Sequence, residues 1–175
     1  KGPQVAVTAV AELRARGISA QLTLLGSVFA GYEWFEEDLR RRVADLGLAE
    51  QVEFVGFDPD IWAYLSRTDI VCVPSIVDEP FGNTAVEAML AGRPLVVSDT
   101  SGLKEAADGF ETVRFVTPDD PVAIADAVQS FMAAWPTVVD HVAGDREQAE
   151  RRHAPSAYAE ALIGALGANG YRSST

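Results

Sequence analysis

The stretch IVCVPSIVDEPFGNTAVEAMLAGRPLVVS, residues 70–98, decides the fold. It opens with the apolar run 70–73 and closes with the apolar run 95–98, and neither run alternates with charged residues. Strands of this kind are typical of a parallel sheet that is covered on both faces. Between them, residues 83–91 have the pattern of a helix that stops at Gly92. The stretch therefore predicts a strand–helix–strand unit with two parallel strands.

The same alternation of apolar runs and amphipathic segments continues on both sides of this unit. Strands are expected at residues 21–25, 52–55 and 113–116, and helices at 3–16, 33–46, after Pro59, and at 103–107, 121–135, 136–152 and 155–166. Alternating strands and helices form right-handed βαβ units around a parallel sheet. We expect an α/β fold, a Rossmann-like doubly wound parallel sheet with helices on both faces. The helix at the start is unusual, because a βαβ fold normally begins with a strand.

Composition limits the classes of function. The chain has 175 residues, which fits one domain or a piece of a larger protein, and its net charge is −12. Such an acidic chain is a poor match for nucleic acid or anionic membrane, where Lys and Arg must meet phosphates. One cysteine, Cys72, excludes an internal disulfide. There is no apolar stretch of the ~18–20 residues that a membrane span needs, no Walker phosphate loop and no dinucleotide glycine fingerprint.

The segment with the clearest chemical signal is the start of the helix after residue 82. The first amides of a helix, here those of Asn83, Thr84 and Ala85, have no partner within the helix. Together with the helix dipole they form a site that attracts phosphate. Gly82, just before them, lets the backbone approach a ligand closely. A phosphate-bearing ligand is therefore one interpretation of this helix start.

Two glutamates bracket the same helix start, Glu79 on the preceding loop and Glu87 about one turn inside the helix. Carboxylates accept paired hydrogen bonds from vicinal hydroxyls, such as those of a ribose or a pyranose. A purely structural interpretation stays open at this point. An acid in the first turns of a helix can simply complement the helix dipole, and Asn83 can be an ordinary N-cap.

The joint pattern resembles the donor-binding half of the retaining GT-B glycosyltransferases of the group 1 family. Members of that family carry two glutamates separated by seven residues, as Glu79 and Glu87 are here. The motifs around them also match: Pro74-Ser75, Pro80-Phe81-Gly82, Glu87-Ala88-Met89, Gly92-Arg93-Pro94 and Gly102-Leu103-Lys104-Glu105. The resemblance extends from about residue 1 to residue 166 and is strongest between residues 71 and 105.

The resemblance assigns roles residue by residue. Glu79 takes the catalytic position that faces the donor sugar, and Glu87 holds the ribose hydroxyls of the nucleotide. The remaining donor-binding positions are the helix-start residues Phe81, Gly82, Asn83 and Thr84, the base-binding loop at Gly56 and Phe57, and Lys1, which matches part of the family's diphosphate grip. The resemblance implies no metal and no other cofactor. The two histidines, His141 and His153, are expected at the surface of the C-terminal helices.

The sequence departs from the family pattern in three places. The Gly-Arg half of the diphosphate grip is absent, together with the strand that carries it, and in this fold that strand lies in the middle of the sheet. Ser101 stands where many members have glycine. Glu111-Thr112-Val113 stands where a glycine is common before the last strand. We therefore expect the C-terminal half of a GT-B fold that lacks its first strand.

The function that the resemblance implies is donor binding in a retaining hexosyltransferase. Residues 1–166 would form a nucleotide-sugar (donor) binding domain for a UDP- or GDP-type donor, and residues 167–175 a flexible tail. The acceptor would bind to an N-terminal domain that is absent here, so the chain alone is expected to be inactive, and any membrane contact is expected only through that domain. We expect the protein to be a bacterial, cytoplasmic enzyme. Two alternatives stay open: another GT-B enzyme, such as a sugar-nucleotide epimerase, and a degenerate module that only binds nucleotides or proteins.

Overall fold

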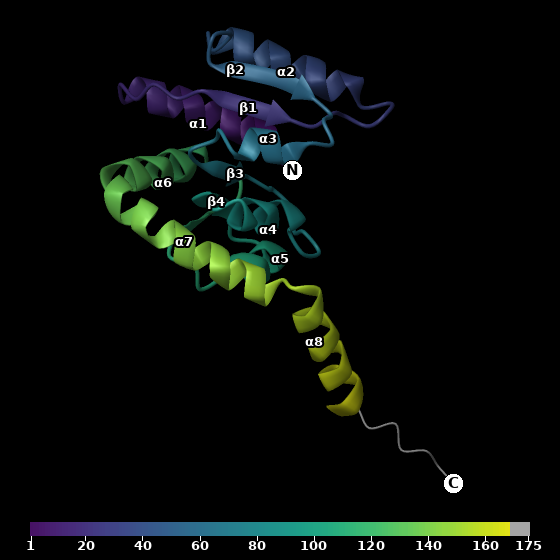
Figure 1. Ribbon diagram of the computed structural model, residues 1–175. Coiled ribbons are helices and arrows are strands. Elements are labelled where there is room, and N and C mark those ends of the chain that lie inside the picture. The colour runs from purple at the N-terminus through teal and green to yellow at the C-terminus, as the bar shows by residue number, and fades with distance from the viewer. Residues whose placement is uncertain (169–175) are drawn as a thin grey trace.

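The computed structural model describes residues 1–168 (Figure 1). In chain order the elements are α1 (Pro3–Ala15), β1 (Leu22–Leu25), α2 (Glu33–Asp45), β2 (Val52–Gly56), α3 (Ile61–Leu65), β3 (Val71–Val73), α4 (Asn83–Leu90), β4 (Leu95–Ser98), α5 (Ser101–Ala107), β5 (Val113–Val116), α6 (Pro121–Ala133), α7 (Trp135–Arg152) and α8 (Pro155–Ala168). Most boundaries fall within two residues of the expected ones. The expected tail begins inside α8, and its residues 169–175 lie outside the described part of the chain.

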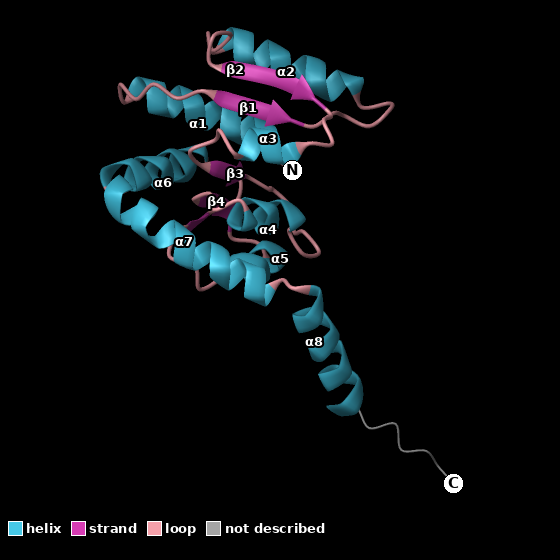
Figure 2. Ribbon diagram, viewed as in Figure 1, coloured by secondary structure: helices cyan, strands magenta, loops and turns pink. Residues whose placement is uncertain are grey.

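All strand ladders are parallel, as the α/β pattern predicted (Figure 2). β1 pairs with β2, and β3, β4 and β5 form a separate ladder in that order. In a doubly wound sheet of strand order 3-2-1-4-5-6, the first strand lies between the second and the fourth. Here β1 and β3 correspond to those two flanking strands. The division into two sheets therefore falls where the expected missing first strand would lie.

Helix α1 packs against both sets of strands. Its residues Val5 and Ala9 join one apolar cluster with Val96 of β4 and Val116 of β5. The cluster formed by the other side of α1 combines residues of α1, α2 and β2: Val7, Val10, Leu39, Val43 and Val52. α1 thus belongs to two cores, one on each side of the division in the sheet.

The sheet β3–β5 is covered on both faces. All four residues of β4 are buried, because α1 and α6 cover one face while α4, α5 and the end of α7 cover the other. This double coverage explains why residues 95–98 show no polar alternation. β1 and β2 differ, since the register pairs Thr23 with Glu53 and both side chains are exposed. One face of that outer ladder is therefore open to solvent.

Within residues 1–168, no single helix is both long and apolar enough to cross a membrane, and α6 and α7 meet those criteria only when joined across a 96° bend.

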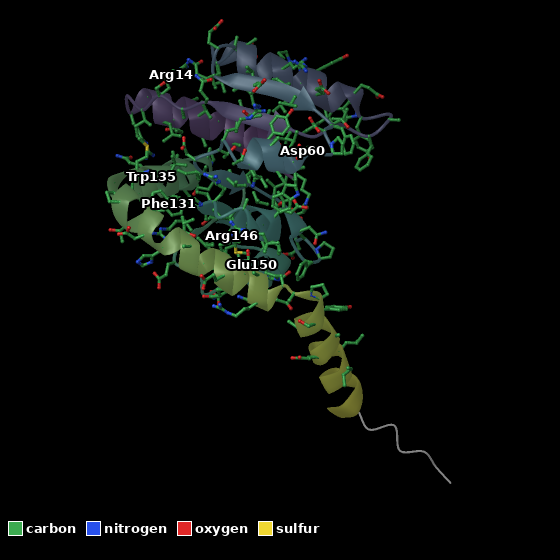
Figure 3. All side chains as sticks on the ribbon, in the orientation of Figure 1. Arg14, Asp60, Phe131, Trp135, Arg146 and Glu150 are labelled. Atoms are coloured by element: carbon green, nitrogen blue, oxygen red, sulfur yellow. The ribbon has the colours of Figure 1, made fainter. Side chains whose placement is uncertain are left out.

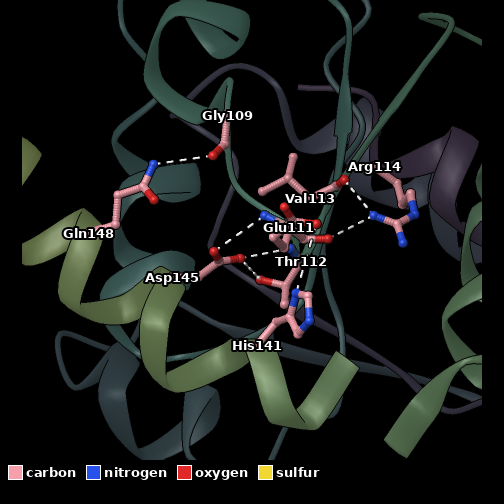
Figure 4. Close-up of polar contacts among 8 residues, drawn as sticks. All are labelled: Gly109, Glu111, Thr112, Val113, Arg114, His141, Asp145 and Gln148. Carbon is pink, nitrogen blue, oxygen red and sulfur yellow. Dashed lines mark hydrogen bonds and ion pairs between the residues drawn. The ribbon is translucent and has the colours of Figure 1, made fainter. Parts of the chain in front are cut away.

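A buried carboxyl group attaches α7 to the start of β5 (Figure 4). Asp145, which is 7% exposed, accepts hydrogen bonds from the amide of Glu111 at 3.2 Å and from the amide of Thr112 at 2.7 Å. The hydroxyl of Thr112 donates a third bond to Asp145 at 2.6 Å. This is the segment where the sequence lacks the family's usual glycine. The Asp145 carboxyl group therefore fixes a turn whose local sequence departs from the family pattern.

Replacing Asp145 should cost substantial stability. The substitution Asp145→Ala leaves the buried amide and hydroxyl of Thr112 without an acceptor, so we expect the free energy of unfolding to fall by about 2–4 kcal/mol. Urea denaturation followed by circular dichroism would measure the change. The matched control is Asp140→Ala, an exposed position on the same helix, which should change stability by less than about 0.5 kcal/mol. Equal losses in the two variants would contradict the role assigned to Asp145.

Candidate functional site

The candidate site lies at the carboxyl end of β3, where the chain runs from Pro74 through a loop into α4. Gly82 is the N-cap of α4 and has φ 98°, a left-handed conformation that favours glycine. A Cβ at Gly82 would lie 2.6 Å from Cδ2 of Leu103, so α4 begins in close contact with α5. The loop therefore reaches the helix start through a position that suits only glycine.

Two of the three helix-start amides remain available to a ligand. Among the described residues, nothing accepts a hydrogen bond from the amides of Asn83 and Thr84. The expectation for Ala85 was wrong, because its amide donates to the carbonyl of Gly82 at 2.9 Å. The N-cap is also Gly82 rather than Asn83, so the N-cap interpretation of the Asn83 side chain does not apply.

Glu79 is buried and held by two donors, one from its own loop and one from the start of the chain. It is 9% exposed, and its carboxylate accepts hydrogen bonds from the hydroxyl of Ser75 and from the ammonium of Lys1. Burial pushes the pKa of Glu79 upward, but the bonds from Lys1 and Ser75 and the charge of Lys1 outweigh it and lower the pKa below its ordinary value. Glu79 is therefore ionised at neutral pH.

Lys1 reaches Glu79 because the chain passes very close to the end of β3. Gly2 has φ 82°, and a Cβ on it would lie 2.0 Å from the carbonyl oxygen of Pro74. This contact places Lys1 beside the loop that carries Glu79, 78 residues away in sequence. The Lys1 side chain is 67% exposed, so its ammonium group remains accessible to a ligand.

Glu87 lies one turn inside α4 and is half-buried. Burial raises the pKa of Glu87, and the charge of Lys1 counteracts that rise. The charge of Lys1 therefore acts on both acids, Glu79 directly and Glu87 at longer range. The structure brings together these three residues, which the sequence analysis singled out from separate stretches.

The loop of Glu79 is fixed against the start of α5. The carboxyl group of Asp78 accepts hydrogen bonds from the amide and the hydroxyl of Ser101, both at 3.1 Å. A Cβ on Gly102 would lie 1.9 Å from the carbonyl oxygen of Glu79 and 2.9 Å from the amide nitrogen of Phe81. The backbone of the loop thus lies directly on Gly102, which defines the position of the Glu79 backbone.

Gly56 is the last residue of β2, and Phe57 is the first residue of the loop that follows it. Gly56 has φ 83°, and its carbonyl accepts a hydrogen bond from the amide of Gly26 at 2.7 Å, which joins the loops after β1 and β2. Phe57 is 77% exposed. Within residues 1–168, no hydrogen bond or ring contact joins Phe57 to the loop of Glu79. Phe57 is therefore an open aromatic side chain at this edge of the sheet.

The sequence analysis assigned no role in the site to four residues that contribute to it: Ser75, Asp78, Gly102 and His153. The sequence did supply a signal for Ser75 and Gly102, since both belong to quoted motifs, but it gave neither a role. His153, expected at the surface, is partly buried and packs its ring against Phe81. No local pattern points to that contact, because the two residues are more than seventy positions apart.

A separate hollow of about 420 Å³ lies elsewhere, and none of the expected site residues lines it. Its walls are Trp62, Ser66, Leu90, Ala91, Arg93, Arg146 and Glu150, from α3, α4 and α7; Figure 3 labels Arg146 and Glu150. Among residues 1–168, no three His, Cys, Asp or Glu side chains are placed to hold a metal ion.

The fold and this site define a class, the C-terminal Rossmann-like domain of the GT-B glycosyltransferases. HepE from Anabaena, determined in complex with UDP and glucose, superposes with a TM-score of 0.85 at 24% identity over 95% of this chain and 45% of that one. The C-terminal domain of LpcC, a glycosyl transferase group 1 family protein from Francisella tularensis, has a TM-score of 0.73 at 22% identity and covers 87% of this chain and 79% of that one.

The family follows from the sequence itself. Residues 1–152 match the model of the family "Glycosyl transferases group 1", and the chain belongs to that family. A D-inositol 3-phosphate glycosyltransferase from Corynebacterium jeikeium is 38% identical over 133 residues, which is 73% of this chain and 31% of that protein. The chain thus spans about a third of the length of that curated relative.

The contact between Gly102 and the loop provides a test of the site's construction. The substitution Gly102→Ala forces the loop of Glu79 away from α5, so we expect a stability loss of about 1–3 kcal/mol or more. Thermal denaturation would measure the loss. The control is Gly144→Ala in α7, where nothing lies within 4 Å of an added Cβ and where alanine should stabilise the helix by up to about 1 kcal/mol. A Gly102→Ala variant as stable as the parent would show that the loop is not fixed by this contact.

Proposed function

We propose that this chain is the donor nucleotide-sugar binding domain of a retaining glycosyltransferase that uses a UDP- or GDP-type donor. The observation that carries the proposal is the convergence of Lys1 and Glu79, with Glu87 nearby, beside the free amides of α4. A nucleotide-sugar presents negative phosphates and many hydroxyls, and this edge of the sheet offers partners for both. The structures of HepE with UDP and with UDP-glucose, which share this fold, support a donor of that class.

Each part of the donor has a partner of suitable chemistry. The distal phosphate would accept hydrogen bonds from the amides of Asn83 and Thr84 and approach the positive end of the α4 dipole. Glu87 would accept hydrogen bonds from the ribose hydroxyls. The base would lie against the loop of Gly56 and Phe57, where the exposed ring offers a stacking face. In a chain of net charge −12, Lys1 and the amino end of α4 would be the positive groups that face the phosphates.

In this proposal Glu79 positions the sugar and does not attack it. An acceptor hydroxyl oxygen bonds to the anomeric carbon on the face from which the diphosphate leaves, the bond from that carbon to the phosphate oxygen breaks, and the hydroxyl proton goes to the leaving phosphate oxygen. The ionised Glu79 steadies the positive charge that develops on the sugar. Lys1 and the amides of α4 stabilise the departing diphosphate.

The acceptor would bind to an N-terminal domain, and we infer that this chain alone does not transfer a sugar. The relative from Corynebacterium jeikeium and HepE are both more than twice as long as the part that this chain covers. The two alternatives, a sugar-nucleotide epimerase and a non-catalytic binding module, make different predictions. An epimerase needs a proton-transferring residue at the sugar, and a non-catalytic nucleotide-binding module does not need the sugar-facing carboxylate of Glu79.

Nucleotide titration tests the proposal. Isothermal titration calorimetry of the chain with UDP and with GDP should show binding of at least one nucleotide. The substitution Glu87→Ala removes the acceptor for the ribose hydroxyls and should weaken that binding by about tenfold or more, the value of one or two charge-assisted hydrogen bonds.

The matched control for this titration is Glu50→Ala, which removes an exposed glutamate from the turn before β2, at the opposite edge of the sheet. Its nucleotide affinity should equal that of the parent chain. Absence of binding by both nucleotides, or equal affinities for the Glu87→Ala and Glu50→Ala variants, would overturn the proposed donor site. Sugar transfer by the chain alone would contradict the inference that the acceptor domain is required.

The Glu87 carboxylate should lower the stability of the free protein even though it contributes to the proposed ligand binding. Because burial raises its pKa, the ionised form is disfavoured in the folded state at neutral pH. The substitution Glu87→Gln should therefore raise the melting temperature at pH 7, and the gain should disappear as the pH falls through the raised pKa and the parent carboxyl becomes protonated. Thermal scans from pH 7.5 to pH 4, with Glu50→Gln as the control, would measure this. A lower melting temperature for Glu87→Gln at pH 7 would contradict it.

A further inference from the structure

We propose that His153 is a positioning residue for the donor-binding loop, and that it couples the junction of α7 and α8 to the ring of Phe81. The inference rests on the proposed function only in the name given to the loop; the coupling itself is a property of the free protein. Nothing in the family resemblance assigns a role to this histidine.

The first observation is the contact between two distant segments. His153 is the C-cap of α7, and α8 begins two residues later at Pro155. The imidazole and the ring of Phe81 are 6.0 Å apart between centroids and inclined at 81°, an edge-to-face arrangement. Phe81 directly precedes Gly82, the N-cap of α4. A displacement of His153 therefore reaches the helix start through a single ring contact.

The second observation is the hydrogen bonding of the imidazole. One ring nitrogen forms a hydrogen bond with the backbone of Ala106 in α5, whereas Nε2 is buried and has no partner among the described residues. A neutral imidazole has one N–H donor, and the bond at Ala106 uses it. Protonation would add a second N–H at Nε2, where no acceptor is present. The packed arrangement therefore suits only the neutral histidine.

The surrounding charges favour the same state. Burial and the charge of Arg152 lower the pKa of His153, and the Ala106 bond only partly opposes them. The charged residues on the loop, on and just after α5, and in the last turn of α7 are Asp78, Glu79, Lys104, Glu105, Asp108, Glu150, Arg151 and Arg152. Of these, only Arg152 contributes to the shift. No carboxylate compensates a proton on His153.

Arg152 fixes the end of α7 so that the contact is held in place. Its guanidinium donates to the carbonyls of Asp108, at 2.6 Å, and of Glu105. α7 is thereby attached to the end of α5, while α8 leaves the body of the domain in a new direction at this point (Figure 1). His153 lies between this fixed end and the departing helix. A change in the direction of α8 would act first on His153 and then on Phe81.

The consequence is a pH-dependent loop. Above the lowered pKa, the neutral imidazole packs against Phe81. As the pH falls through that pKa, the added proton must reach water, so the Phe81 contact opens and the donor-binding loop loses its support. The contribution of the contact to stability is therefore present at neutral pH and lost in acid.

The test uses proton NMR of the whole chain without ligand. The chain has two histidines, so its imidazole signals can be assigned with His153→Phe and His141→Phe, the latter at a side chain that is 43% exposed. We expect the Phe81 ring signals to shift with the same midpoint as the His153 signals, and to become independent of pH between 5 and 8 in His153→Phe. In His141→Phe the Phe81 transition should be unchanged. Phe81 signals that do not follow His153 would overturn the inference, whatever the outcome for nucleotide binding.

A binding measurement extends the test to the donor. The UDP affinity of the parent chain should fall with decreasing pH more steeply than that of His153→Phe, by up to about tenfold per pH unit below the His153 pKa. Protonation of UDP itself affects both measurements equally and cancels in the ratio of the two affinities. An equal pH dependence in the two proteins would show that His153 does not act on the donor site. If UDP binds to neither, the proposed function fails, while the NMR titration still decides the coupling between His153 and Phe81.

Discussion

The packing of α1 against two separate sets of strands is the constraint on which the rest of the structure depends. β1–β2 and β3–β5 are not hydrogen-bonded to each other within the described residues, so side-chain packing must hold them together. α1 does this by placing Val7 in one core and Val5 in the other. Its N-cap, Gly2, also lies against Pro74, which brings Lys1 to Glu79. The same helix therefore joins the two halves of the domain, and the residues just before it supply the cation of the candidate site.

Close backbone contacts at glycine define the geometry of that site. Gly2 lies against Pro74, Gly82 against Leu103, and Gly102 against the carbonyl of Glu79. Each contact leaves no space for a Cβ, so a small change at any of them shifts the loop between β3 and α4 relative to its neighbours. A site of this type depends on backbone positions more than on individual side chains. That is consistent with a proposed role in which amides and a helix start meet a phosphate.

The sequence predicted the repeating architecture well, because strand burial and helix ends leave local patterns. The strands at residues 95–98 and 113–116 have the expected bounds, and α4 starts at Asn83 as expected. It could not predict contacts between segments that no local pattern connects, such as Asp145 with Thr112 or His153 with Phe81. The sequence analysis wrongly expected the amide of Ala85 to have no hydrogen-bond partner. Its acceptor is the carbonyl of Gly82, whose left-handed conformation depends on packing against α5.

The pKa values of the two glutamates are shifted in opposite directions, and this difference is itself an argument about their roles. Glu79 already has two donors, so its charge is stabilised before any ligand arrives. Glu87 is half-buried and accepts no hydrogen bond from the described residues, so burial raises its pKa. In the proposed complex, ribose hydroxyls would donate hydrogen bonds to the Glu87 carboxylate and lower its pKa again. In that complex Glu87 would be the acid whose pKa shifts on binding, whereas Glu79 would remain a fixed charge that faces the reacting sugar.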